Sequence, residues 1–492
     1  MSKRLINSLI ISAMTLAALF IALVWVPAEA AYTSYCHNNY DLGIYGQALF
    51  QLSLKNPNPW LSVRELKLFN DHFDPILFFL TPFKSLAHPA ILLIRFEMLI
   101  ALATAATFLV MAHRQAITFA TATFMAAFVL FNPASLGSFT FPAHPGTWAI
   151  LPLTWTCWFL WREKWRAALF TFFFCLLCKE EYPVVGIAVG LTMIAVSNMI
   201  TLNASGRRRS GAEFLGLSLL WAFLAFALRP ALLGHAGQYT GSVKQASGLR
   251  ELLQWDSFRE IAIWSMRWTL PLIAILIPAL WTWVRSDRKF PPRASLTRIA
   301  PVIAIFLALL AIRATGGWWF SHRSIPLATT AAFLAIPLVP FYQSRMRGRN
   351  FPWAIAGILL VLTAHQSLRP ALRYWQGNDM APHCPSRPSR VASLDQAVAM
   401  LLARPDGKAL VQGNILPHLV ERNAVHHLGA TAEAPESFQW LLVEKNKLGA
   451  TWPADPGVVA NTVNTWLALP GVKPVMDDEN VLMLERPGLQ SL

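Results

Sequence analysis

The chain has 492 residues, of which 55% are hydrophobic and only 14% are charged. Soluble globular domains carry about 25% charged residues, so this composition excludes an ordinary soluble domain and indicates a protein that is integral to the lipid bilayer. The formal net charge is +15. Most of the basic clusters lie between hydrophobic stretches, as they do in cytoplasmic loops, and we therefore expect no nucleic-acid partner.

The N-terminus predicts a membrane anchor. Lys3 and Arg4 precede an apolar run over residues 5–26, and a bilayer span needs about 20 residues. Residues 28–30 (Ala-Glu-Ala) resemble a signal-peptidase site, but the apolar core is longer than the usual roughly 7–15 residues of a signal peptide. We expect an uncleaved anchor, with cleavage as the alternative.

Residues 27–88 form the first large loop, and residues 40–50 within it (YDLGIYGQALF) predict an amphipathic helix. Its apolar residues recur at helical spacing: Leu42, Tyr45, Leu49 and Leu52. One face of the helix can then lie on a bilayer or on neighbouring helices. Asp41 stands at the front of the helix, where the positive end of the helix dipole stabilises an anion. Two roles are open for Asp41: a general base or metal ligand at the membrane surface, or a simple N-cap.

A second acidic cluster lies in the same loop, in the segment FNDHFDP. Asp71 and His72 form a pair that could ligate a divalent cation or bind a phosphate. Asp74 precedes Pro75, a pattern typical of an N-cap followed by a first-turn proline. The apolar stretch within residues 73–87 is too short to span a bilayer comfortably, so we expect a re-entrant or surface-lying helix there.

Ten further spans are predicted, which with the first make eleven. They lie at about 89–111, 116–135, 146–161, 166–179, 183–200, 213–233, 260–284, 299–314, 325–343 and 351–368. Alternate loops between them carry the basic residues: 113–114, 161–166, 207–209, 285–293 and 345–349. Because positive charge marks cytoplasmic loops, we place these loops in the cytoplasm, together with Lys3 and Arg4.

The sequence pattern changes after the last span. From Ser389 onward, helical and strand-like segments alternate, which is typical of an α/β domain. We therefore divide the chain into a multi-spanning membrane domain, residues 1–368, and an extracytoplasmic domain, residues 369–492. The predicted fold class is an all-α polytopic membrane protein of the inner (plasma) membrane with a small C-terminal α/β domain.

Three charged residues interrupt the hydrophobic segments: Lys179, Glu180 and Glu181. Charges at membrane depth are costly unless they are paired or hydrated. Lys179 and Glu180 can neutralise each other at a helix end, which still leaves one carboxylate. Glu180 and Glu181 are therefore candidates for catalysis or metal binding, and Lys179 is a candidate for binding an anion.

Histidines and an arginine lie in loops on the same predicted side. His144, in PAHP, and His322 with Arg323, in FSHRS, could bind an anionic head group. A single histidine is more often a structural residue, and it is the shared side that points to a site.

The chain has five cysteines. Cys175 and Cys178 have CxxC spacing but lie in an apolar run, so we expect buried small hydrophobic residues there. Cys36 and Cys384 both fall on the extracytoplasmic side, where an oxidising compartment permits a disulfide between the first loop and the C-terminal domain.

Five motifs resemble, in the same order, those of a bacterial membrane family known as domain of unknown function 2079. They are YDLGIYGQALF, HFDPILFFLTPFKSL, FPAHP, KEEYP and LPHLVERNAVHHL. The resemblance covers nearly the whole chain. That family is similar to the glycosyltransferase-C superfamily of multi-spanning enzymes, which take sugars from lipid-linked donors outside the cytoplasm. The first external loop of these enzymes carries an essential Asp, and by position this implies Asp41.

The resemblance extends to two further motifs. A KED-like motif corresponds to residues 179–181, with Glu181 in place of the last Asp. An FDFHP-like motif corresponds to residues 141–145, with His144 in its histidine position and Ala143 in its acidic position. We therefore do not expect an acid role at this second motif.

We predict an inverting glycosyltransferase of the hexosyltransferase type. It would use a polyprenyl-phosphate-linked sugar donor on the extracytoplasmic face and an acceptor that the sequence does not identify. Asp41 would take the acceptor proton, and the donor phosphate would be held by Lys179, His144, His322 and Arg323. The donor carries its own leaving group, so a divalent cation (Mg²⁺ or Mn²⁺) is optional. Two other classes fit the sequence: a transporter or flippase for lipid-linked saccharides, and a non-catalytic assembly protein of the cell envelope.

Overall fold

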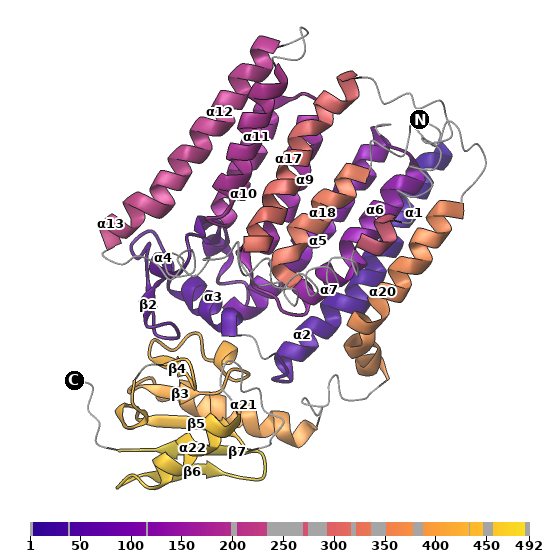
Figure 1. Cartoon of the computed structure of the whole chain (residues 1–492). Coiled ribbons are helices and arrows are strands. Elements are labelled where there is room, and N and C mark those ends of the chain that lie inside the picture. The colour runs from indigo at the N-terminus through magenta and orange to yellow at the C-terminus, as the bar shows by residue number, and fades with distance from the viewer. Residues whose placement is uncertain are drawn as a thin grey trace.

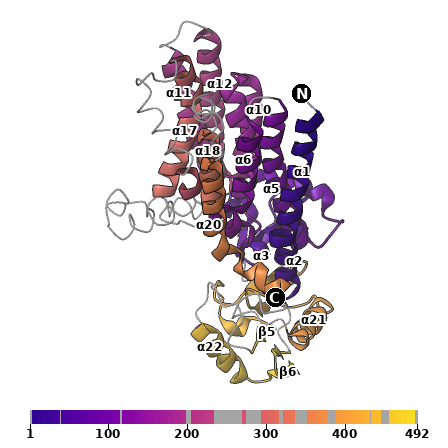
Figure 2. The same ribbon diagram turned by 90° about the vertical axis from the view of Figure 1, so that its right-hand side faces the viewer.

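The computed structural model describes residues 3–37, 40–114, 117–197, 204–233, 269–273, 293–315, 321–335, 351–376, 387–431, 433–445 and 456–487. This part of the chain is mostly helical and has one five-stranded sheet near the C-terminus. In Figure 1 the long helices run beside one another and the sheet lies at one end of them. Figure 2, turned by 90°, shows the same two-part arrangement.

The helical part begins with three segments that follow one another without a break: α1 (Lys3–Phe20), the π-helix η1 (Ile21–Trp25) and α2 (Val26–Thr33). The first loop then contains α3 (Tyr40–Gln51), β1 (Trp60–Leu61), β2 (Leu66–Lys67), α4 (Leu68–Asp71) and the 3₁₀ helix η2 (Pro75–Phe83). The later helices are α5 (Pro89–His113), α6 (Phe119–Phe131), α7 (Pro133–Phe139), α8 (Pro145–Trp148), α9 (Ile150–Trp161), α10 (Trp165–Cys178), α11 (Tyr182–Ser197), α12 (Ala204–Phe223), η3 (Leu224–Leu228), α13 (Arg229–Leu233), α17 (Arg293–Thr315), α18 (Ser321–Ala335) and α20 (Phe351–Trp375).

Three continuous helical stretches in the described residues are long and apolar enough to cross a membrane: Leu5–Thr33, Pro89–His113 and Ala204–Leu233. The bent pair α6 and α7 makes a fourth if it counts as one span. The eleven predicted spans are therefore not confirmed. Shorter apolar helices such as Trp165–Cys178 and Tyr182–Ser197 rise about 1.5 Å per residue and fall short of the roughly 30 Å hydrocarbon core. The span predicted at about 260–284 lies mostly outside the described residues.

The predicted span at 116–135 is broken. α6 ends at Phe131, α7 begins at Pro133, and the two helices are bent by 45°. Pro133 has no N–H to continue the helix. The side-chain oxygen of Asn132 instead accepts hydrogen bonds from the N–H groups of Ala134 (2.9 Å) and Ser135 (3.1 Å). The proline and the N-cap together start a new helix, which the hydropathy pattern had merged with the preceding one.

α11 and α12 pack closely because glycines face each other. A Cβ atom on Gly190 would lie 2.7 Å from the carbonyl oxygen of Gly211, and one on Gly211 would lie 2.9 Å from that of Gly190. No side chain fits there, so the two backbones approach each other in the way that small residues allow between membrane helices.

α3 does not lie on a bilayer, as one of the predictions for it allowed. Nine of its twelve residues are buried, and it packs between α5 and the C-terminal region around η4 (Leu416–His418). Its buried positions also include the small residues Gly43 and Gly46 and the uncharged Gln47. The amphipathic pattern thus describes a helix buried on both faces.

η2 is too short to span, as expected. It has nine residues and, at about 2.0 Å per residue, extends for roughly 18 Å. Asp74 is its N-cap residue and Pro75 follows, as predicted, but the Asp74 side chain makes no capping hydrogen bond.

The C-terminal region is an α/β unit, as predicted. Its helices are α21 (Pro388–Leu402), η4, η5 (Pro435–Ser437) and α22 (Pro456–Leu467), and its strands are β3 (Ala409–Val411), β4 (Val425–His427), β5 (Trp440–Glu444), β6 (Lys473–Asp477) and β7 (Val481–Glu485). The strand order is β4-β3-β5-β7-β6. β3 pairs in parallel with β4 and β5, and β7 is antiparallel to β5 and β6.

Alternate residues along the central strands face two different cores, because successive side chains of a strand point to opposite faces. On β5, Trp440 and Leu442 join the large core that the sheet shares with α21 and the helical part. Leu441 and Val443 join a smaller core with Trp466 of α22. The sheet is thus covered on both faces, and one face connects it to the rest of the protein.

Candidate functional site

A polar cavity of about 80 Å³ lies where α3, the loop before α8, the α10–α11 turn and α18 meet. It is lined by Asp41, Tyr45, His72, His144, Gly146, Lys179, Glu181 and Pro326. Residues from four of the motifs singled out in the sequence, far apart along the chain, therefore share one site. The lining combines two carboxylates with one lysine and two histidines.

Asp41 lies in the first turn of α3, which begins at Tyr40, and its carboxylate is partly exposed. His144 donates a hydrogen bond from Nε2 to Asp41 Oδ2 over 2.9 Å. Burial raises the pKa of Asp41, but the hydrogen bond and charge of His144, with the charges of His72 and Lys179, outweigh it and lower the pKa below its ordinary value. Asp41 is thus held as a carboxylate that faces the cavity.

His144 is positioned by Glu97, a fully buried acid of α5. Glu97 Oε2 accepts hydrogen bonds from the N–H groups of Ala143 (2.9 Å) and His144 (3.2 Å) and from Trp148 Nε1 (3.1 Å). Ala143 has a φ of 75°, a left-handed conformation that costs a non-glycine residue free energy. Successive N–H groups in such a turn can converge on one acceptor, and here the acceptor is Glu97 Oε2.

The α10–α11 turn presents Lys179 and Glu181 to the cavity. Between them, Glu180 is buried and points away from the cavity to the first loop, where it accepts hydrogen bonds from His72 Nδ1 (3.2 Å) and the N–H of Phe73 (3.1 Å). Glu181 pairs with Arg313 of α17. The two glutamates therefore divide their roles: Glu180 fixes the first loop, and Glu181 lines the site.

His72 connects this turn to the cavity. Burial and the charge of Lys179 lower the pKa of His72, but the charge of Asp71 and the hydrogen bond and charge of Glu180 leave it above its ordinary value. The pKa of Glu180 is raised by burial and lowered more strongly by Lys179 and His72, so that it lies below its ordinary value. Both pKa shifts favour an ion pair between protonated His72 and ionised Glu180.

Asp74 lies behind the cavity wall and is fully buried. Tyr45, which lines the cavity, donates a hydrogen bond from its hydroxyl to Asp74 Oδ2 over 2.7 Å. Burial raises the pKa of Asp74 to about 6. The residue predicted to be a helix cap thus orients a tyrosine of the site.

Other predicted site residues lie elsewhere. Asp71 forms a two-bond ion pair with Arg64, at 2.8 and 3.0 Å, and does not line the cavity. His322 and Arg323 fall in the first turn of α18, and their side chains lie outside the part that the structure describes. Their predicted role in phosphate binding stays a prediction.

Cys175 and Cys178 are free and buried, as expected, and Cys157 is free and buried as well. Cys36 takes part in a disulfide. Its predicted partner, Cys384, lies outside the described residues, so the pairing stays a prediction.

The C-terminal unit packs directly against the helix that carries Asp41. A Cβ atom on Gly43 would lie 2.6 Å from Leu416 Cδ2, and one on Gly46 would lie 2.9 Å from Val420 Cγ1. Gln47 donates a hydrogen bond to the Arg422 carbonyl oxygen over 3.1 Å. The position of Asp41 therefore depends on the C-terminal unit as well as on the membrane part.

A candidate metal-ligand cluster lies outside the cavity, at the contact between the first loop and the C-terminal unit. Among the residues that the structure describes, the one group with three ligand atoms within 4.8 Å of one another is Glu65, His426 and Glu433, at the contact between the first loop and the sheet. Glu433 is also paired with Lys408.

Sequence reasoning missed Glu97, Arg313 and the Tyr45–Asp74 pair. A signal existed for the first two, because each is a charged residue inside an otherwise apolar helix, and such residues are functional candidates by default. The helical spacing places Tyr45 on the apolar face of α3, and only the packing of the first loop shows where the Tyr45 hydroxyl points.

The chain belongs to the family described as predicted membrane protein (DUF2079), which it matches over residues 31–461. The matched region includes every residue of the cavity. Comparison with curated proteins gives no match. The chain is thus a membrane protein of this family, and its chemistry has to be argued from the site.

Proposed function

We propose that this protein is an inverting glycosyltransferase that uses a polyprenyl-phosphate-linked sugar donor. The observation that carries the proposal is the placement of an ionised, partly exposed carboxylate, Asp41, in the same cavity as Lys179 and His72. A base and a set of cations around one small space are what a displacement at a sugar phosphate requires.

The reaction balances with the residues of this site. The acceptor hydroxyl oxygen attacks the anomeric carbon and gives its proton to the Asp41 carboxylate. The bond between the anomeric carbon and the phosphate oxygen breaks, and the lipid phosphate leaves with the electron pair. Lys179, with His72, stabilises the charge that grows on this phosphate. A general base of this kind contributes about 10²–10⁴-fold in rate.

The charge distribution supports an extracytoplasmic site. Lys164 and Arg166 line a cavity with the first residues of α12, and α12 begins at the end of the helical part away from the sheet (Figure 1). Basic residues mark the cytoplasmic side. The cavity that Asp41 lines lies toward the sheet, beside α3. An inner-membrane protein oriented in this way would present the site and the C-terminal unit to the outside.

The test is a transfer assay with the purified full-length chain in liposomes, offered radiolabelled polyprenyl-phosphate sugars and a cell-envelope extract as the source of acceptor. We expect labelled product, and we expect Lys179→Gln to raise the KM for the donor at least tenfold. The matched control is Lys67→Gln, which removes an exposed lysine of the first loop outside the cavity. Movement of intact donor across the bilayer without cleavage would instead identify a flippase, and neither transfer nor movement would identify an assembly protein.

A further inference from the structure

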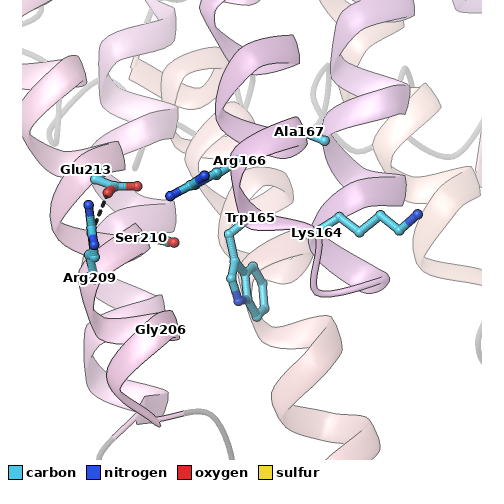
Figure 3. Close-up of a pocket in the computed structure, with 8 residues that line it drawn as sticks. All are labelled: Lys164, Trp165, Arg166, Ala167, Gly206, Arg209, Ser210 and Glu213. Atoms are coloured by element: carbon cyan, nitrogen blue, oxygen red, sulfur yellow. Dashed lines mark hydrogen bonds and ion pairs between the residues drawn. The ribbon is translucent and has the colours of Figure 1, made fainter.

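A second cavity, of about 550 Å³, lies between the N-terminal ends of α10 and α12. Figure 3 shows the residues that line it on these two helices, with Trp165 and Arg166 on one side and Arg209, Ser210 and Glu213 on the other. In Figure 1 the beginning of α12 lies at the end of the helical part away from the sheet. This cavity is therefore remote from Asp41.

The lining carries more positive than negative charge. Lys164, Arg166 and Arg209 are basic, and Glu213 is the acid. Arg209 is paired with Glu213 over 3.0 Å. In the described part of the chain, Lys164 and Arg166 are exposed and their side chains form no ion pair. In Figure 3 the Arg166 side chain extends toward Ser210 and Glu213, whereas that of Lys164 extends away from α12. Arg166 is thus the cation that faces the cavity, and the exposed Lys164 would have to turn to reach an anion there.

The same two helix faces continue as apolar surface. On α10, Phe170 lies one turn after Arg166 and is 65% exposed, and Phe173 follows. On α12, Leu220 lies two turns after Glu213 and is 55% exposed. Residues spaced by three, four and seven positions share one face of a helix, so each face runs from a charged end to an exposed hydrophobic stretch.

We propose that this cavity binds one anionic phospholipid, with its phosphate at Arg166 and at a Lys164 side chain turned toward it, and its acyl chains along the exposed apolar faces of α10 and α12. The charge complementarity selects an anionic head group, and the continuous apolar stretch selects a lipid over a soluble anion. Trp165, whose indole lines the cavity, is the residue type that occupies the level of lipid head groups. The site is independent of the proposed transferase reaction.

The test measures lipid retention by native mass spectrometry of the full-length protein, exchanged into detergent with phosphatidylglycerol or with phosphatidylethanolamine. We expect one phosphatidylglycerol to be retained in preference to phosphatidylethanolamine. The double variant Lys164→Gln/Arg166→Gln should weaken this binding about thirtyfold. The matched control, Arg162→Gln/Arg208→Gln, removes two exposed charges from the same end of the helices but from outside the cavity, and should change it less than threefold.

A second variant fills the cavity without changing any charge. Gly206 lines the cavity and a Cβ atom on it would meet nothing within 4 Å, so Gly206→Trp leaves the fold intact and should abolish phosphatidylglycerol retention. If the double variant and its control lost phosphatidylglycerol binding equally, the binding would reflect a general attraction to surface charge, and the proposed site would be wrong. Retention in Gly206→Trp, or no preference over phosphatidylethanolamine, would overturn it as well.

Discussion

The carboxylate of Glu97 holds the turn that positions His144, and its removal should be the most damaging single change near the site. Three donors converge on one oxygen: the N–H groups of Ala143 and His144 and Trp148 Nε1. A buried donor left without a partner costs about 1–3 kcal/mol, so Glu97→Ala should lower the free energy of unfolding by about 3–9 kcal/mol. Total stability is typically about 5–15 kcal/mol.

Glu97→Gln should cost much less. Its carbonyl oxygen can take the place of Oε2, and its amide nitrogen would face the Ser138 hydroxyl, which lies 3.5 Å from Oε1. The amide oxygen of Gln keeps all three donors paired, so only the contact with Ser138 changes, and we expect a loss of about 1–2 kcal/mol.

The assay is thermal unfolding of the purified variants in detergent, followed by tryptophan fluorescence. Glu213→Ala serves as the control, because Glu213 takes part in an exposed ion pair and such pairs contribute about 0–1 kcal/mol. If Glu97→Ala proved as stable as Glu213→Ala, the turn would have to be held by something other than the carboxylate, and this explanation of the His144 geometry would fail.

Three further predictions concern pH, packing and the C-terminal unit. Folded Asp74 has its pKa raised to about 6, against about 3.9 in an unfolded chain, so its contribution to stability is present below pH 4 and is lost as the pH rises through 6. The melting temperature of Asp74→Asn should therefore rise relative to that of the wild type as the pH increases from 4.5 to 7.5. A difference in melting temperature that stays constant over this range would contradict the prediction. Gly190→Ala should destabilise the helices by at least about 1–3 kcal/mol through overpacking, whereas Gly216→Ala, which meets nothing within 4 Å, should be neutral or stabilising; equal melting temperatures would refute the close packing. Arg390→Met leaves Glu444 buried without its ion-pair partner and should cost about 3–5 kcal/mol, measured by protease resistance of the C-terminal unit, with an unchanged digestion rate as the contrary result.

Much of the C-terminal unit could be predicted from the sequence, because its periodicities are local. The apolar run over residues 440–443 forms a strand that is buried on both faces, and helices and strands alternate along the unit as the pattern from Ser389 onward predicted. The break between α10 and α11 was also readable, since Lys179, Glu180 and Glu181 interrupt the apolar pattern there.

The number of spans and the partners of the site residues could not be predicted in the same way. Hydropathy merges α6 and α7 although Pro133 separates them, because both sides of the proline are apolar. The contact between Asp41 and His144 joins residues 103 positions apart and depends on how α3, α5 and the C-terminal unit pack. Asp71 resembled a site residue in its motif, and only the position of Arg64 shows that it belongs to an ion pair.

The central claim is that Asp41 is the base of a transferase, and replacing Asp41 and Asp71 one at a time tests it most directly. Asp41→Asn keeps the size of the side chain and removes the carboxylate, and Asp71→Asn makes the same change at an acid of the same loop outside the cavity. In the liposome transfer assay, normalised to folded protein, we expect Asp41→Asn to lower kcat about 10²–10⁴-fold with little change in the KM for the donor. We expect Asp71→Asn to keep its kcat per folded molecule. Full turnover in Asp41→Asn would contradict the account, and a collapse of turnover in Asp71→Asn alone would place the base at that residue instead.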